Sequence, residues 1–212
     1  FERANSLLSN TLPVHIINRM NRNPKEIFFA DSYTSASVLV MDIVSFTEYS
    51  SQLDAKSVVT LLDSLFSQID SVIDSYHVEK IKTHGDNYVA ATGIPNSDEN
   101  SYKNIALFAL KIIDIVENFN KSHNTNCQLR IGIHCGPLIA GVIGKKKYTY
   151  DLWGSTVTFA YRMNSTDIPG RIQVSREFYE KLADEFIFDE RAPVPVKSYG
   201  MKTNFFLIGI KN

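Results

Sequence analysis

The stretch KIKTHGDNY, residues 80–88, decides the fold because it places a two-residue turn between two apolar runs. Apolar and β-branched residues surround Gly85 and Asp86, in segments 78–83 and 88–92. This pattern predicts a tight β-hairpin in which both turn residues adopt unusual backbone angles. The carboxylate of Asp86 then stands at the tip of the hairpin, where a ligand can reach it.

A second carboxylate, Asp42, follows the apolar run 38–41 and precedes Ile43. A strand that ends in an acid presents that acid at the edge of its sheet. If this strand pairs with the hairpin, Asp42 and Asp86 converge, and two hard oxygen ligands suit Mg²⁺ or Mn²⁺ bound with a phosphate-bearing substrate. The alternative is that Asp86 only serves the turn and Asp42 only caps the next helix.

The bulk composition limits the size and the partners of the protein. With 212 residues and 44% hydrophobic side chains, the chain suits one good core better than two domains. A net charge of −1 gives no strongly basic surface, so we expect no nucleic-acid partner. The spacing of Cys127 and Cys135 is not that of a metal knuckle, which indicates a reducing, cytoplasmic setting.

The first residue leads us to expect that the chain belongs to a longer protein. The sequence has no run of eighteen apolar residues and no signal peptide. It begins with Phe1 and not with Met, so we expect an upstream regulatory region, for which membrane attachment is an open alternative.

Helical and strand periodicities alternate along the chain. Helices are predicted at about 2–20 with a break at Pro13, and at 55–76, 102–120, 155–164 and 175–182; strands are predicted at 37–44, 78–92 (the hairpin), 128–134, 138–143, 148–152, 171–174, 185–190 and 204–210. Gly136-Pro137 is expected to turn the chain between two of these strands, and Ser175 to cap a helix.

This order predicts an α+β sandwich. It has a ferredoxin-like βαββαβ core with additional C-terminal strands and helices, and one sheet with helices packed on it. Such units carry their helices on one face, leaving the other free for a ligand or partner. We divide the chain into a connecting helix and linker, 1–34, and a catalytic domain, 35–212.

Four motifs in this order resemble the class III adenylate cyclase catalytic domain. They are DIVSFT (42–47), KIKTHGD (80–86), GIHCGP leading into GVIG (132–144), and YDLWGSTVTFAYRM (150–163). The resemblance covers roughly residues 35–210. Polymerase palms share the layout of paired acids, but a palm or a diguanylate cyclase would need different residues around the second acid.

The resemblance implies a two-metal site. Asp42 and Asp86 match the metal-binding aspartates, the carbonyl of Ile43 matches an auxiliary ligand, and Phe46 and Thr47 lie in the same motif beside the substrate. Two Mg²⁺ or Mn²⁺ ions would lower the pKa of the ribose 3′-hydroxyl, align it on the α-phosphorus, and neutralise the departing pyrophosphate.

The resemblance also implies that Lys82 and Asp151 read the purine. A lysine donor towards N1 and an aspartate acceptor for the exocyclic amine fit adenine. Guanine presents a protonated N1 and a carbonyl, so both groups would face like partners. Guanylate cyclases of the family typically carry Glu and Cys here, so the sequence predicts ATP as substrate.

Three further residues complete the implied site. Arg162 matches the arginine that stabilises charge on the α-phosphate, and Lys197 the lysine that binds the terminal phosphates. The family commonly has Asn where this chain has Thr158. A threonine hydroxyl is shorter, so we expect turnover to survive at a modest rate.

In the family, the metal-binding acids come from one chain and the purine, arginine and lysine residues from another. This chain holds both sets, so we expect a homodimer with two equivalent sites and an N-terminal helix that couples upstream signals to the dimer. The product is then 3′,5′-cyclic AMP with pyrophosphate. The alternatives are a guanylate cyclase and a non-catalytic, nucleotide-binding or dimerisation module.

Overall fold

A computed structural model describes residues 8–26, 28–44, 54–144 and 147–211. Phe46 and Thr47 therefore lie outside the described residues. The helices are α2 (Val14–Arg22), α4 (Ala55–Ile73), the 3-10 helix η1 (Asp74–Tyr76), α5 (Ser101–His123), α6 (Ser155–Ser165) and α7 (Arg176–Leu182). The strands are β1 (Phe29–Val44), β2 (Glu79–His84), β3 (Asn87–Thr92), β4 (Gln128–Ile143), β5 (Thr149–Trp153), β6 (Arg171–Val174), β7 (Phe186–Glu190), β8 (Val194–Val196), β9 (Gly200–Lys202) and β10 (Phe205–Ile210).

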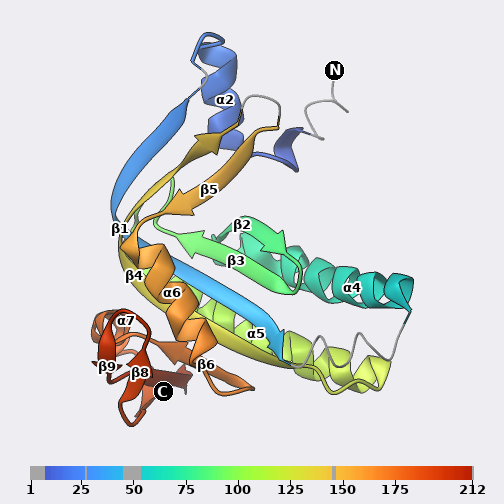
Figure 1. The fold of residues 1–212 in the computed structure, drawn as a ribbon, viewed down its shortest axis with the longest axis vertical. Coiled ribbons are helices and arrows are strands. Elements are labelled where there is room, and N and C mark those ends of the chain that lie inside the picture. The colour runs from blue at the N-terminus through green and yellow to red at the C-terminus, as the bar shows by residue number, and fades with distance from the viewer. Residues whose placement is uncertain (1–7, 27, 45–53, 145–146, 212) are drawn as a thin grey trace.

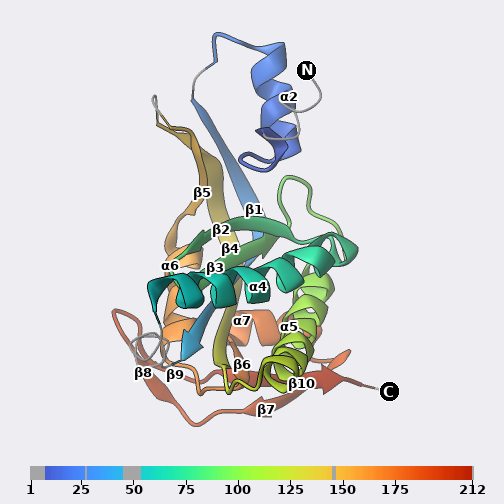
Figure 2. The same cartoon turned by 90° about the vertical axis from the view of Figure 1, so that its right-hand side faces the viewer.

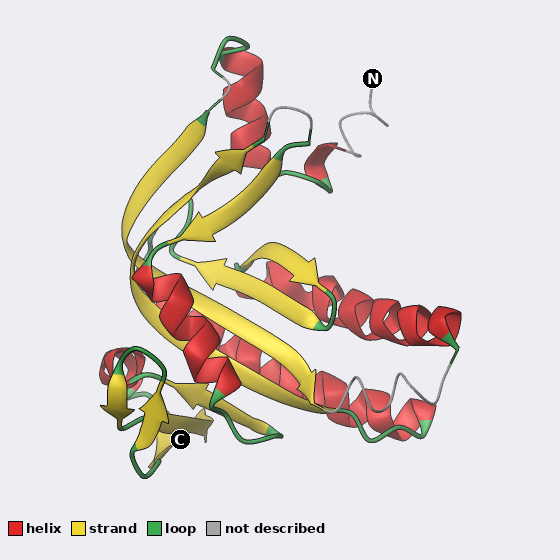
Figure 3. Cartoon of the chain, viewed as in Figure 1, coloured by secondary structure: helices red, strands yellow, loops and turns green. Residues whose placement is uncertain are grey.

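The strands form one large mixed sheet and one small hairpin. The large sheet has the order β2-β3-β1-β4-β6-β10-β7, with β5 also paired to β4, and β8 pairs with β9. The sequence β1-α4-β2-β3-α5-β4 with the spatial order β4-β1-β3-β2 confirms the predicted ferredoxin-like core (Figure 3). Only β4 and β6 pair in parallel among the described strands.

Alternation along β1 assigns its side chains to two cores. Leu39, Met41 and Ile43 face the core formed with α4, α5 and α7, where α4 and α5 cover one face of the sheet (Figure 2). Val38 and Val40 face the second core, which is formed with α2 and α6. The two helices of the ferredoxin-like core, α4 and α5, thus share one face as expected, whereas the additional helix α6 crosses β1 and β4 on the opposite face (Figure 1).

Two predicted boundaries are wrong. Strand β1 begins at Phe29 rather than Ser37, and its added residues pair with the far half of β4, with a register shift between Tyr33 and Ala36. Gly136-Pro137 does not turn the chain, because β4 runs through it without a break. Proline is tolerated there because the irregular register opposite it relaxes the hydrogen-bond ladder. The long arm of β1, β4 and β5 gives α2 a surface to pack on.

The predicted hairpin is confirmed, with one difference. His84 pairs with Asn87, leaving a two-residue loop, and Gly85 has φ +61°. Asp86 is not among the residues with positive φ, so glycine alone supplies the unusual angle. Tyr88 anchors the hairpin on α4 by donating a 2.6 Å hydrogen bond to Asp70. No helix among the described residues has the length and apolar character needed to cross a membrane.

Candidate active site

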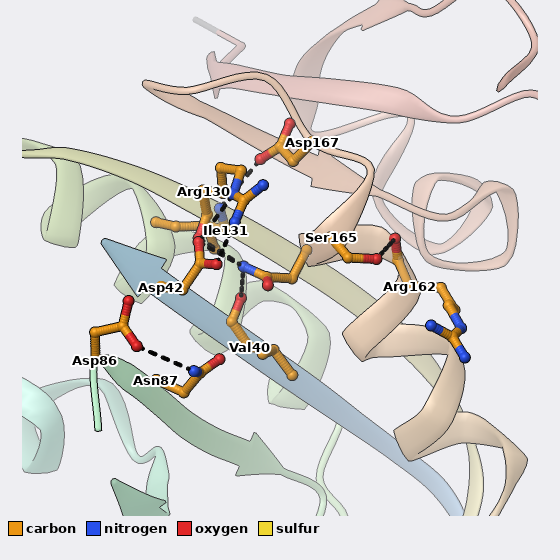
Figure 4. A network of polar contacts seen from close by, with 10 residues as sticks. Val40, Asp42, Asp86, Asn87, Arg130, Ile131, Arg162, Ser165 and Asp167 are labelled. Atoms are coloured by element: carbon orange, nitrogen blue, oxygen red, sulfur yellow. Dashed lines mark hydrogen bonds and ion pairs between the residues drawn. The ribbon is translucent and has the colours of Figure 1, made fainter. Parts of the chain in front are cut away.

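The two predicted metal-binding acids lie on neighbouring strand ends. Met41 of β1 pairs with Tyr88 of β3, so the next residue, Asp42, comes beside the turn that holds Asp86. Figure 4 shows Asp86 next to the end of β1 that carries Asp42. The predicted pairing of the strand before Asp42 with the hairpin is therefore confirmed. The antiparallel register of these strands brings Asp42 and Asp86 to the same end of the sheet.

Asp42 is also held by a residue that the sequence reasoning missed. Arg130 stands directly opposite Asp42 on β4, and its Nε and Nη2 donate to the two carboxylate oxygens at 3.0 and 2.5 Å. This hydrogen-bonded pair raises the pKa of Arg130 above its ordinary value. Only 13% of the Asp42 side chain is exposed, so the bidentate pair is partly shielded from water.

Asn164 of α6 also contacts the pair formed by Asp42 and Arg130. Its side-chain nitrogen donates to the carbonyl of Arg130 at 2.9 Å and lies 3.4 Å from Asp42 Oδ1. Asp167, in the loop after α6, accepts hydrogen bonds from the backbone N–H groups of Ile131 and Ile168. Burial raises the pKa of Asp167 to about 7. The sequence signal for these partners is weak, because cross-strand register and helix packing bring them together.

The donor set fits a divalent cation that is completed by substrate. Among the described residues, no group of three or more His, Cys, Asp or Glu side chains is arranged to hold a metal ion. Two carboxylates at one strand edge are nevertheless a set that Mg²⁺ uses when phosphates and water supply the other ligands. The carboxylate of Asp86 has a single described contact, a long one of 3.4 Å from Asn87, so it can accept an ion.

The two predicted purine readers form an ion pair with each other. Lys82 Nζ lies 2.5 Å from Asp151 Oδ2, although the residues belong to β2 and β5. The other oxygen of Asp151 accepts a hydrogen bond from the Leu152 backbone N–H at 2.8 Å. The side chains are 34% and 21% exposed, so a base can reach both. Tyr161 of α6 is electrostatically coupled to both, and burial raises its pKa.

Helix α6 carries the predicted phosphate and ribose groups on one face. Thr158 is exposed and Arg162 follows one turn later. The Nε of Arg162 is buried without a hydrogen-bond partner in the described structure. Figure 4 shows the Arg162 side chain pointing away from Asp42 and Asp86.

Lys197 is exposed in the turn between β8 and β9, two short strands that the sequence patterns did not predict. Val196 and Tyr199 flank this lysine and pack with Phe159 and Met163 of α6. The lysine is thereby tied to the helix that carries Arg162. The site residues therefore fall into two groups. We call Asp42, Asp86 and their partner Arg130 the acid group. The helix group consists of two residues of α6 and three that lie outside it: Thr158, Arg162, Lys82, Asp151 and Lys197.

A ferredoxin-like core with two acids at one strand edge and an arginine on a crossing helix is the arrangement of a class III nucleotide cyclase domain. Residues 28–209 match the family described as the adenylate and guanylate cyclase catalytic domain, and the chain belongs to this family. The predicted recognition is therefore confirmed at the level of the family.

Relatives include both substrate types. The chain is 39% identical over 210 residues to an adenylate cyclase of Mycobacterium tuberculosis, covering 99% of this chain and 47% of the relative. It is 38% identical over 187 residues to a receptor-type guanylate cyclase of Caenorhabditis elegans, covering 86% and 15%. The chain thus spans about half the length, or less, of these curated relatives.

Among solved structures, the guanylate cyclase domain of RhGC from Catenaria anguillulae, in complex with GTP, superposes with a TM-score of 0.82 at 30% identity. The match covers 85% of this chain and all of that one. The fold class is confirmed.

Proposed function

We propose that this chain is an adenylate cyclase catalytic domain that converts ATP to 3′,5′-cyclic AMP and pyrophosphate in sites shared by two copies of the chain. The observation that supports shared sites is that Asn164 and Arg162 project from different sides of α6. Asn164 contacts Asp42, and Arg162 precedes it by two residues, or about 200° around the helix. Arg162 therefore faces away from the acids of its own chain, so it would complete the site of a twin.

Adenine is favoured by the chemistry of the purine pair. In the proposed complex, Lys82 donates to N1 of adenine and Asp151 accepts from the exocyclic amine, and both are partly exposed to meet the base. Guanine would place a donor against the ammonium and an acceptor against the carboxylate, leaving polar groups unpaired. A guanylate cyclase is the second candidate, because relatives of that type match the chain closely.

Asp42 and Asp86 would hold two divalent cations, with the carbonyl of Ile43 as an auxiliary ligand. When bound, these ions activate the ribose 3′-hydroxyl and neutralise charge on the departing pyrophosphate. Arg130 pairs with Asp42 beside this site, where its guanidinium is placed to meet the negative phosphates as they approach.

In the reaction, the 3′-hydroxyl loses its proton to solvent and its oxygen forms a bond to the α-phosphorus. The bond between the α-phosphorus and the oxygen that bridges to the β-phosphate breaks, and pyrophosphate leaves. Arg162 of the twin chain would donate to the α-phosphate oxygens as their charge develops, and its side chain is partly exposed for this purpose. Thr158 would orient the ribose, and Lys197 would bind the terminal phosphates on a hairpin held against α6.

The test measures kcat/KM for ATP and for GTP with Mn²⁺, scored by the cyclic product. We expect ATP to be preferred, and Lys82→Glu with Asp151→Cys to reverse the preference. A matched control is Lys103→Glu, because Lys103 forms an exposed ion pair with Glu185 away from the site. A wild-type preference for GTP would favour the guanylate cyclase, and no product from either nucleotide would favour a non-catalytic module.

A further inference from the structure

Asn164 is the one described side chain of α6 that reaches the acid group. It is 4% exposed, and its Nδ2 lies 2.9 Å from the carbonyl of Arg130 and 3.4 Å from both the carbonyl of Val40 and Asp42 Oδ1. A side-chain amide has two N–H donors, so three acceptors share them. A change at any one acceptor therefore redistributes the hydrogen bonds to the other two.

The backbone around Asn164 leaves little slack between α6 and the sheet. A Cβ added at Gly132 of β4 would lie 2.0 Å from the Asn164 nitrogen and 2.6 Å from the Met163 carbonyl carbon. The helix therefore rests directly on the strand that carries Arg130. Displacement of Arg130 or Asp42 acts on α6 through atoms already in contact, since close-packed interiors transmit strain.

The opposite side of α6 carries residues that, in the proposed dimer, belong to the site of the other copy. Arg162 points away from Asp42 (Figure 4), and Met163 packs with Val196 beside Lys197. One helix thus contacts the acid group of its own chain through Asn164 and, in the proposed dimer, presents Thr158 and Arg162 to the other copy.

We propose that Asn164 is a positioning residue that couples metal occupation at Asp42 to the placement of α6, and hence of Arg162 in the twin site. A cation at Asp42 competes for carboxylate lone pairs and repels the Arg130 guanidinium. Both effects change the acceptors that hold Asn164. This coupling rests on the proposed function, because it requires the shared sites.

Trp153, the only tryptophan of the chain, reports on α6 because it directly precedes Gly154, the N-cap residue of the helix. The experiment titrates the whole chain with Mg²⁺ in the absence of nucleotide, following binding by calorimetry and Trp153 emission in parallel. In the wild type, we expect the emission to change with the same midpoint as binding. In Asn164→Ala, we expect binding within about threefold of wild type and at least a fivefold smaller emission change.

Ser165→Ala is the matched control, because Ser165 is exposed on α6 and, among the described residues, its hydroxyl donates to the carbonyl of Arg162 alone. It should behave as wild type. Asn164→Ser is used if Asn164→Ala does not fold. An emission change that persists in the Asn164 variants overturns the coupling. It is also overturned if these variants lose both Mg²⁺ binding and the emission change, or if the wild type binds Mg²⁺ without a change in Trp153 emission. Binding that persists in Asp42→Ala instead refutes the proposed metal site.

Discussion

The substitution Gly132→Ala tests whether the close packing of α6 against the sheet controls catalysis. Gly132 is buried in β4, and the added methyl carbon would lie 2.0 Å from the backbone nitrogen of Asn164 and 2.7 Å from its Cα. Ordinary van der Waals contact begins at 3.4 Å, so helix and strand must separate by about 1.4 Å. The neighbours are backbone atoms, which cannot rotate away as the end of a side chain can.

This separation sets the expected magnitude. Inserting one methyl group into a tight core destabilises a protein by about 1–3 kcal/mol. A displacement of about 1 Å in a catalytic group lowers the rate by about a hundredfold. Because α6 carries Thr158 and Arg162, we expect kcat to fall about a hundredfold while the chain still folds. The KM for ATP should change less, because Lys82 and Asp151 lie on strands and not on α6.

The assay compares steady-state turnover with urea unfolding, at a temperature where circular dichroism shows a folded protein. Gly209→Ala is the control, since a Cβ there meets nothing within 4 Å. It should retain wild-type turnover and stability. A Gly132→Ala protein with the kcat and the unfolding free energy of the wild type would refute the reasoning.

Three further outcomes are expected. Thr158→Asn should raise kcat, because the longer amide reaches the ribose; an unchanged or lower kcat would contradict this. Arg130→Gln should tighten Mn²⁺ binding, measured by electron paramagnetic resonance, by at least about tenfold. Arg130 holds both carboxylate oxygens of Asp42, and its guanidinium would repel a bound cation, so its removal should favour binding; weaker binding would contradict this. The pKa of buried Asp167 is raised from 3.8 to about 7, so the native state binds its proton more tightly and loses stability as pH rises from about 4 to 7. The loss is at most about 4 kcal/mol, and Asp167→Asn should lack this slope in urea unfolding; an identical slope in both proteins would contradict it.

The sequence predicts the core of the fold because its signals are local. The hairpin around Gly85 and the apolar alternation before Asp42 each lie within ten residues, and antiparallel pairing then joins the two acids. Arg130 and Asn164 were missed because their roles arise from register across 88 residues and from helix packing across 122. A glycine followed by a proline normally favours a turn, but tertiary pairing with β1 keeps the segment around Gly136 extended.

The placement of Lys197 illustrates the same limit. The family resemblance suggested its role, but strands of three residues give too little periodicity to predict the hairpin that holds it. The packing of Val196 against α6 is a tertiary contact, and it brings the lysine beside the helix that carries Arg162.

Mixing two inactive variants tests the central claim, that each site combines the acid group of one chain with the helix group of another. Asp42→Ala and Arg162→Ala chains should each be inactive alone. After subunit exchange at equal concentrations, half of the dimers are mixed and each mixed dimer has one intact site. The mixture should then regain about a quarter of wild-type activity per chain. No recovery, under conditions where labelled chains demonstrably exchange, would contradict the account.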